Sequence, residues 1–124
     1  MNLTDLSDRE LLVMKCLWDA AEPMTVGGLI ERIQAGYNIP YKETTVYTFL
    51  KRLKDKNYVT SYKKGSSHFT PCVTEQEYLK QYAKTMAEFW GKGPSGMFLQ
   101  AYAENVSFTA KEWDSFRKKN VKEK

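Results

Sequence analysis

The side chains best suited to chemistry in this 124-residue chain are hydroxyl and basic groups that cluster between residues 42 and 64. This window holds seven basic and two acidic residues, a net charge of +5, against +4 for the whole chain. Such groups hydrogen-bond to phosphates and base edges, and focused positive charge is typical of a surface that binds a polyanion. The alternative is an ordinary solvated face that is basic. The candidate contact residues are Lys42, Thr44, Thr45, Tyr47, Thr48, Lys51, Arg52, Lys63 and Lys64.

No catalytic or metal-binding pattern accompanies these residues. His68 is the only histidine, and the two cysteines, Cys16 and Cys72, have neither the spacing of metal ligands nor that of a disulfide framework. Residues 91–96 spell G-x-G-x-x-G, but Pro94 lies inside the segment and a helix, not a strand, is expected before it, so a nucleotide site is disfavoured. We therefore expect no enzymatic activity, no metal and no cofactor.

Two helices are expected to begin the scaffold that positions the candidate residues. Ser7 and Glu10 form a capping-box pattern, after which apolar residues recur at helical spacing until Pro23. Thr25 is the N-cap candidate of a second helix, which Gly36 is expected to close.

A third helix is expected over about residues 41–56, and it carries most of the candidate side chains. Successive helical residues are about 100° apart, which places four apolar side chains on one narrow face. These are Val46, Phe49, Leu50 and Leu53. Burial of that face turns Thr44, Tyr47, Thr48 and Lys51 outward. Thr45 and Arg52 lie on a flank, where Arg52 is suited either to a pairing with Asp55 or to a phosphate contact.

Two β-prone stretches at about residues 58–71 predict a hairpin whose turn spans 63–67, with Lys63 and Lys64 near its tip. Three helices followed by a hairpin is the order of a winged helix-turn-helix, whose third helix enters the major groove of DNA while the hairpin, or wing, lies on the backbone. The expected fold class is therefore mostly α with a small β-hairpin wing. The alternative function for such a fold is a protein-interaction module that does not bind DNA.

Residues 1–73 are expected to form this DNA-binding domain, and residues 74–124 a helical dimerisation arm. Thr74 and Glu77 are the start of a helix with a dense apolar stripe. So short a segment cannot bury its many aromatic residues alone, so it must either pack on the first domain or dimerise, and the stripe favours a homodimer. The expected dimer residues are Tyr78, Leu79, Tyr82, Met86, Phe89, Trp90, Met97, Phe98, Trp113 and Phe116.

The composition is that of a folded, water-soluble protein. Hydrophobic residues make up 42% of the chain and charged residues 27%, which excludes wholesale disorder. No run approaches the roughly 18 apolar residues of a membrane span, and the first residues do not resemble a signal peptide. We expect a cytoplasmic location.

Several stretches together resemble one known family. The most specific is residues 45–53, in the third helix, and residues 62–65 and 69–71 match in the wing. Residues 6–10 match in the first helix and residues 74–78 in the arm. The further matching positions are Met14, Leu17, Trp18, Gly93 and Ser95. From Leu6 to about Lys118, the sequence resembles the penicillinase repressor family, the BlaI/MecI/CopY group of bacterial transcriptional repressors.

This resemblance implies a homodimer that binds a palindromic operator in double-stranded DNA and represses adjacent genes. In the family, either copper or a membrane-bound sensor protease releases the operator. The protease cuts an Asn-Phe bond in the fifth helix, whereas the aligned residues here are Ala101 and Tyr102. The cysteine-rich C-terminal motif of copper-responsive members is absent, and Ser66 stands where many members have Arg in the wing. The resemblance therefore predicts repression but assigns no inducer, operator or regulated gene.

Overall fold

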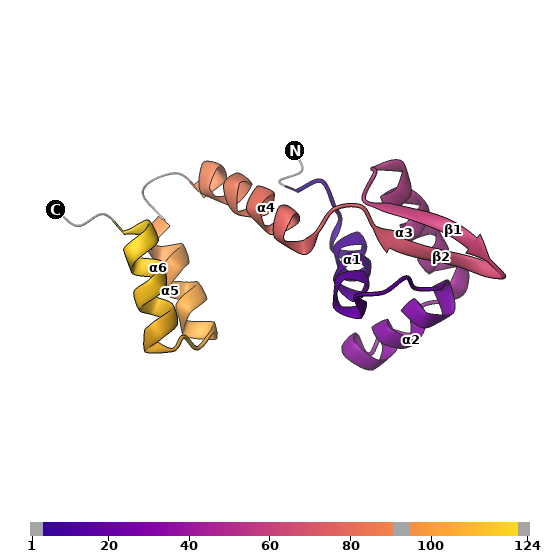
Figure 1. Cartoon of the computed structure of the whole chain (residues 1–124), viewed down its shortest axis with the longest axis horizontal. Coiled ribbons are helices and arrows are strands. Elements are labelled where there is room, and N and C mark those ends of the chain that lie inside the picture. The colour runs from indigo at the N-terminus through magenta and orange to yellow at the C-terminus, as the bar shows by residue number, and fades with distance from the viewer. Residues whose placement is uncertain (1–3, 91–94, 122–124) are drawn as a thin grey trace. The chain divides into compact units, whose positions relative to one another are not determined.

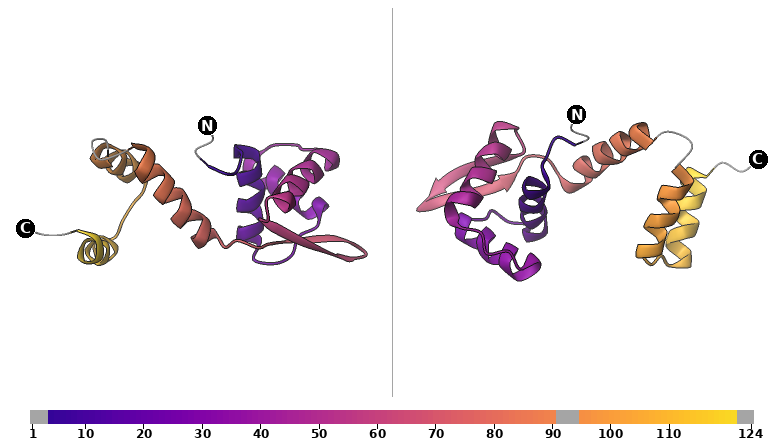
Figure 2. Two further views of the ribbon diagram at one scale, coloured as in Figure 1. Left: turned by 90° about the horizontal axis from the view of Figure 1, so that it is seen from above. Right: turned by 180° about the vertical axis from the view of Figure 1, so that it is seen from behind.

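A computed structural model describes residues 4–90 and 95–121 of the chain. It divides into two compact units, Met1–Met86 and Ala87–Lys124. The first contains three helices, a two-stranded antiparallel hairpin whose tip projects beyond those helices, and most of a fourth helix (Figures 1 and 2). The elements in chain order are α1 (Asp8–Ala20), α2 (Val26–Tyr37), α3 (Glu43–Asp55), β1 (Val59–Lys64), β2 (Ser66–Pro71), α4 (Glu75–Trp90), α5 (Ser95–Asn105) and α6 (Ala110–Asn120).

The start of α1 confirms the predicted capping box. Ser7 Oγ accepts a hydrogen bond from the backbone N–H of Glu10 at 3.2 Å, and the Glu10 carboxylate accepts one from the backbone N–H of Ser7 at 2.8 Å. The reciprocal pair satisfies two backbone donors at the helix start. After the last turn, Ala21 adopts the left-handed conformation with φ at +56°.

Helix α2 begins as predicted but ends later. The hydroxyl of Thr25 accepts a hydrogen bond from the backbone N–H of Gly28 at 3.1 Å. The expected stop at Gly36 is wrong, because Asn38 takes the left-handed position after the helix, with φ at +57°. Asparagine tolerates this conformation because its short polar side chain bonds locally, and here its Oδ1 accepts from Gln34 Nε2 at 3.1 Å.

Helix α3 begins at Glu43, slightly later than the predicted start at about residue 41. Ile39, which precedes Pro40, is disfavoured in a helical conformation, and the backbone N–H of Tyr41 donates to the Ile39 carbonyl in a tight turn. The Tyr41 ring then packs edge-on against Phe49. The predicted apolar face is confirmed, since the residues on it are at most 5% exposed: Val46, Phe49, Leu50 and Leu53.

The wing is a hairpin with a shorter turn than predicted. Residues 63–67 were expected to form the turn, but the strands extend into this stretch and only Gly65 lies between them. Its φ of +72° belongs to a region that residues with a Cβ rarely adopt. In addition, Met24 pairs with Phe69 through two backbone hydrogen bonds, so the loop after α1 is joined to the edge of β2.

The core of the first unit includes the beginning of α4. Tyr78 is 6% exposed, and its ring centroid lies 5.6 Å from that of Trp18. Trp18 Nε1 donates to the Val73 carbonyl at 2.9 Å, and Lys15 Nζ lies 2.6 Å from Glu75 Oε2. These contacts attach the start of α4 to α1. The other buried hydrophobic residues are Leu6, Val13, Met14, Cys16, Leu17, Val26, Leu29, Ile33, Val46, Phe49, Leu50, Leu53, Val59 and Phe69.

The second unit contains α5 and α6. Thr109 caps α6, since its hydroxyl accepts a hydrogen bond from the backbone N–H of Glu112 at 3.1 Å. Residues 91–94 of the glycine-rich segment 91–96 lie outside the described residues, and its last two residues, Ser95 and Gly96, already belong to α5. The helix expected before this segment is α4, which ends at Trp90.

Candidate nucleic-acid interface

The outward face of α3 holds most of the predicted contact residues. Thr44, Tyr47, Thr48 and Lys51 are all exposed, as is Arg52 on the flank. Thr45 is half-buried, and Lys42 is exposed immediately before the helix. Within the described parts of the chain, no ion pair joins Arg52 to Asp55. The helix therefore presents hydroxyl, phenol and basic groups together on one side.

Thr48 has a defined hydrogen-bonding state. Its hydroxyl donates to the backbone carbonyl of Thr44 at 2.9 Å, the i to i−4 pattern that is common for threonine in helices. The donor of Thr48 is thus occupied, while the lone pairs of its oxygen stay available. A partner on DNA would be a hydrogen-bond donor rather than an acceptor.

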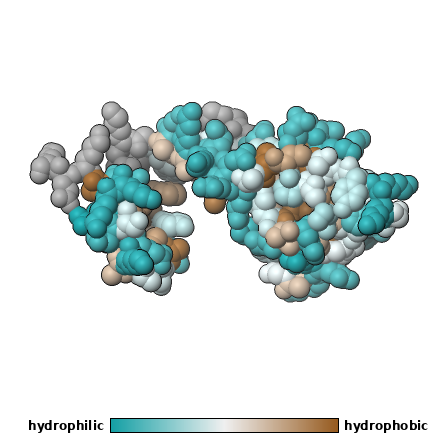
Figure 3. Space-filling view, viewed as in Figure 1, coloured by the Kyte–Doolittle hydropathy of each residue, from teal (hydrophilic) through white to brown (hydrophobic). Residues whose placement is uncertain are grey.

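The tip of the wing is basic and exposed. Lys63 and Lys64 are the last residues of β1, and Ser66 opens β2. Hydrophilic residues cover this tip at the right of the space-filling view (Figure 3). Lysine ammonium groups at such a place are suited to contacts with phosphate, which add affinity without reading sequence.

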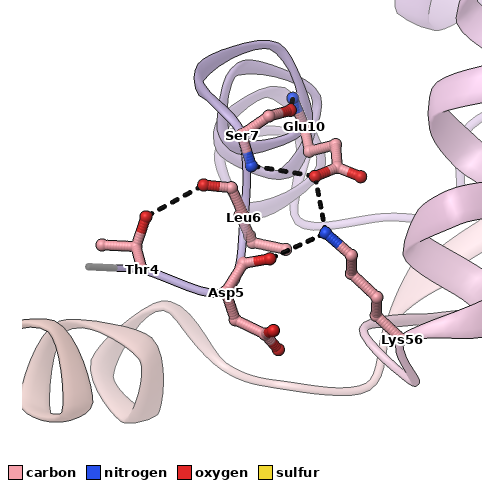
Figure 4. A network of polar contacts seen from close by, with 6 residues as sticks. All are labelled: Thr4, Asp5, Leu6, Ser7, Glu10 and Lys56. Carbon is pink, nitrogen blue, oxygen red and sulfur yellow. Dashed lines mark hydrogen bonds and ion pairs between the residues drawn. The ribbon is translucent and has the colours of Figure 1, made fainter. Parts of the chain in front are cut away.

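Two other lysines of the basic window have structural partners instead. Lys54 Nζ donates to Ser61 Oγ at 3.0 Å. Lys56 Nζ lies 2.9 Å from Glu10 Oε1 and 2.7 Å from the Asp5 carbonyl (Figure 4). These partners are distant in sequence, so a count of charges along the chain could not separate them from the lysines that face solvent.

Helix α3 and the wing are joined on the exposed side of the unit. The rings of Tyr47 and Phe69 meet edge to face with centroids 6.2 Å apart. The bond from Lys54 to Ser61 makes a second link between α3 and β1. Together these contacts hold the wing at a set position beside the outward face of α3.

The two cysteines and the single histidine lie in different surroundings. Cys16 is buried, and burial raises the pKa of its thiol, whereas Cys72 is exposed. His68 lies on the wing, where its ring stacks on Tyr62 with centroids 5.3 Å apart. In the residues that the structure describes, no group of three His, Cys, Asp or Glu side chains is placed to hold a metal ion. Likewise, none of the described helices has the length and apolar character of a membrane span.

The helices after the wing expose much apolar surface. In the second unit, residues of α5 and α6 line a pocket of about 540 Å³, which includes Leu99, Tyr102 and Trp113. Hydrophobic residues are visible at the surface of this unit (Figure 3). Of the predicted dimer residues, Tyr78 is already buried within its own chain and Met86 is half-buried. The exposed ones are Leu79, Tyr82, Phe89, Trp90, Met97, Phe98, Trp113 and Phe116.

The three helices, the hairpin and the basic surface that they share define a winged helix-turn-helix protein. The model of the penicillinase repressor family matches residues 6–120. The chain therefore belongs to the penicillinase repressor family, which is a family of transcriptional repressors and not of enzymes. This confirms the resemblance found in the sequence.

Two curated relatives share part of the chain. Both are described as transcriptional regulator BlaI, from Mycobacterium tuberculosis strains CDC 1551 / Oshkosh and ATCC 25618 / H37Rv, and each is 41% identical over 66 residues. The match covers 53% of this chain but only 46% of each relative, so the chain spans less than half the length of those proteins. A solved structure of monomeric Bacillus licheniformis BlaI in complex with the blaP half-operator is 27% identical, with a TM-score of 0.49 over 62% of this chain and 92% of that one.

Proposed function

We propose that this protein is a homodimeric transcriptional repressor that binds a palindromic operator in double-stranded DNA. The observation that carries the proposal is the two-sided character of α3. One side is buried in the core, and the other presents exposed Thr44, Tyr47, Thr48 and Lys51 with no acidic residue between Thr44 and Arg52. Membership of a repressor family supports the same function.

In this proposal α3 enters the major groove and the wing lies on the backbone. Thr48, whose hydroxyl donor is occupied, accepts from the amino group of adenine or cytosine, and Lys51 donates to guanine. Thr44, Thr45 and Tyr47 supply further contacts to base edges or backbone. The basic residues outside the groove attract the phosphates and add affinity without reading sequence: Lys42, Arg52, Lys63 and Lys64.

The dimer is proposed to form through residues 74–124, whereas residues 1–73 bind DNA. The apolar residues exposed on α4 and, in the second unit, on α5 and α6 support this division, since exposed apolar patches mark interaction sites. The buried Tyr78 then has a different role, because it fixes the start of α4 to the winged-helix unit. A two-fold dimer presents α3 twice, which is why the operator is proposed to be palindromic.

The proposal includes a membrane-bound sensor protease as the upstream partner, which follows from the family resemblance. It also includes a cytoplasmic location, which follows from the sequence pattern of the chain. Ala101 and Tyr102 lie within α5, and the Ala101 carbonyl accepts a hydrogen bond from Asn105 Nδ2 at 2.8 Å. A protease that requires an Asn-Phe bond has no substrate at these two residues. Cleavage would therefore have to occur at another bond, which mass spectrometry of the chain after co-expression with such a protease would identify.

Selection of duplexes from a random pool by the purified full-length chain tests the DNA-binding proposal. We expect enrichment of one two-fold symmetric sequence, with binding that weakens steeply as salt rises. A reporter gene placed behind the selected site should be repressed when the protein is expressed. Enrichment of no sequence, together with absence of salt-dependent binding, would favour the winged-helix protein-interaction module instead.

A further inference from the structure

The two faces of the hairpin have different surroundings, because one is turned to the protein and the other is turned away from it. Paired residues of an antiparallel hairpin point to the same side, and successive residues alternate. The pairs Val59–Pro71, Ser61–Phe69 and Lys63–Ser67 therefore share one face. Val59 is 2% and Phe69 is 4% exposed, so this inner face is the one turned to the protein.

The inner face continues directly into the outward face of α3. Tyr47 contacts Phe69, and Lys54 bonds to Ser61, both of which belong to the inner face. Tyr47 and Lys54 are seven residues apart, so they lie within about 20° of each other around the helix axis. Lys51 is four residues after Tyr47, so its side chain lies beside that of Tyr47 on the exposed side of the helix. One surface thus runs from Lys51 across this junction and onto the wing.

Lys63 and Ser67 are at the far end of that surface. They are paired across the hairpin, which places their Cβ atoms about 5 Å apart. Lys63 is exposed and Ser67 is half-buried. An ammonium and a hydroxyl at this separation can bind two oxygens of a single phosphate or of adjacent phosphates.

The outer face of the wing has a different composition. Lys64 and Ser66 are paired there, next to the pair of Tyr62 and His68. The rings of Tyr62 and His68 are nearly parallel, with 6° between their planes, and His68 Nδ1 is 2.9 Å from the Ser66 carbonyl oxygen. Because successive residues of a strand point to opposite sides, Lys64 shares this face with Tyr62 and His68 and points away from the inner face that contacts α3.

We infer that Lys63 and Ser67 form the phosphate-binding pair of the wing, and that Lys64 makes no direct contact with DNA. This inference rests on the proposed DNA-binding function and assigns Ser67 a role that its residue type alone would not suggest. Lys64 contributes only to the long-range field that attracts the duplex, which salt screens over about 8 to 10 Å.

Four single substitutions, matched in pairs, test the inference. Binding of the selected duplex and of a scrambled duplex of equal composition is measured over a salt series for Lys63→Ala, Lys64→Ala, Ser67→Ala and Ser66→Ala. Lys63→Ala should lower the slope of log affinity against log salt by about one unit per bound wing, on both duplexes. Ser67→Ala should weaken both by about threefold per wing. Lys64→Ala should change the slope less than half as much as Lys63→Ala, and Ser66→Ala should leave binding unchanged.

Equal slopes for Lys63→Ala and Lys64→Ala, or an effect of Ser66→Ala as large as that of Ser67→Ala, would overturn the inference. Failure of the DNA-binding proposal has a separate signature, because the unsubstituted protein itself would then show no salt-dependent binding. All four positions are on the wing surface, so circular dichroism and thermal unfolding should show the same fold in every variant.

Discussion

The ammonium nitrogen of Lys56 lies 2.9 Å from the carboxylate of Glu10, the one charged residue in the described core (Figure 4). Glu10 is 2% exposed and belongs to α1, while Lys56 follows the last turn of α3. The same ammonium bonds to the backbone carbonyl of Asp5 at 2.7 Å. Lys56 thus joins the end of the proposed reading helix both to α1 and to the segment before it.

Removal of this ion pair should destabilise the protein. Lys56→Met leaves the Glu10 carboxylate buried without its counter-charge, and we expect the free energy of unfolding to fall by about 2 kcal/mol. This is below the range for fully buried pairs because the Lys56 side chain is 36% exposed. Lys54→Met is the matched control. Within the described residues its ammonium bonds to the uncharged hydroxyl of Ser61 alone, and its loss should cost about 0.5 kcal/mol. Urea denaturation near neutral pH measures both, and equal losses would contradict the assigned role.

The Glu10 contribution should depend on pH. Burial by itself would raise the pKa of Glu10, but the hydrogen bonds from the Ser7 backbone and from Lys56 outweigh it and hold the pKa below its ordinary value of 4.5. A lowered pKa in the folded state stabilises the fold fully above pH 4.5, and this stabilisation is lost as pH falls through the folded-state value. The difference in unfolding free energy between the unsubstituted protein and Glu10→Gln should therefore be largest near neutral pH and shrink in acid. If the difference in unfolding free energy instead grows below pH 4.5, the pKa of Glu10 is raised in the folded state and not lowered.

Two left-handed backbone positions predict substitutions of opposite effect. Ala21 has φ at +56° and Gly65 has φ at +72°, a region that is strained for residues with a Cβ. Ala21→Gly should stabilise the protein by up to about 1 kcal/mol, and Gly65→Ala should destabilise it by about 1 kcal/mol. Gly36→Ala is the control, because Gly36 lies inside α2 and an added Cβ meets nothing within 4 Å, so it should be mildly stabilising. Thermal unfolding measures these changes. A lower stability for Ala21→Gly than for Gly65→Ala would contradict the left-handed conformations assigned to these two residues.

Local patterns accounted for much of the fold. The capping box at Ser7 and Glu10 depends on residues three apart, and the buried face of α3 depends on helical periodicity alone. Both kinds of information are contained in a few neighbouring residues. The end of α2 is an exception, because glycine is the commoner stop signal and the sequence therefore favours Gly36, whereas Asn38 adopts the required left-handed conformation with a side-chain bond to Gln34.

Contacts between distant segments were not predictable in the same way. Nothing near Lys56 in sequence indicates that Glu10 will be its partner, and nothing near Tyr78 indicates that Trp18 will cover it. Charge counting therefore placed Lys56 with the lysines that face solvent, and periodicity placed Tyr78 among the dimer residues. The predicted contact residues of α3 are brought to one exposed side because their positions follow directly from the burial of the opposite face.

The proposed dimer predicts that a charge on the apolar surface of α6 will separate the two chains. Trp113 and Phe116 are both exposed, and their rings stack with centroids 5.7 Å apart. Phe116→Glu should weaken dimerisation by about 2 kcal/mol or more, since burial of an unpaired carboxylate in the interface has a large free-energy cost. Ser115→Glu adds the same charge on a different side of α6 and should leave the dimer intact. Sedimentation at micromolar concentration distinguishes the two, and a dimer that survives Phe116→Glu would place the interface elsewhere.

The last prediction concerns sequence preference, which should depend on α3 and not on surface hydroxyls in general. Thr48→Ala should relax discrimination at one base pair in each half-site, at a cost of about 1–3 kcal/mol per half-site on the preferred duplex, because its oxygen is proposed to accept from a base amino group. Lys51→Ala should relax a neighbouring position and also reduce the salt slope, since it removes a charge from the groove. Thr60→Ala is the matched control, because Thr60 is exposed on the outer face of the wing. Repeating the selection of duplexes with each variant measures these changes, and an unchanged preferred sequence for both Thr48→Ala and Lys51→Ala would mean that α3 does not read the groove.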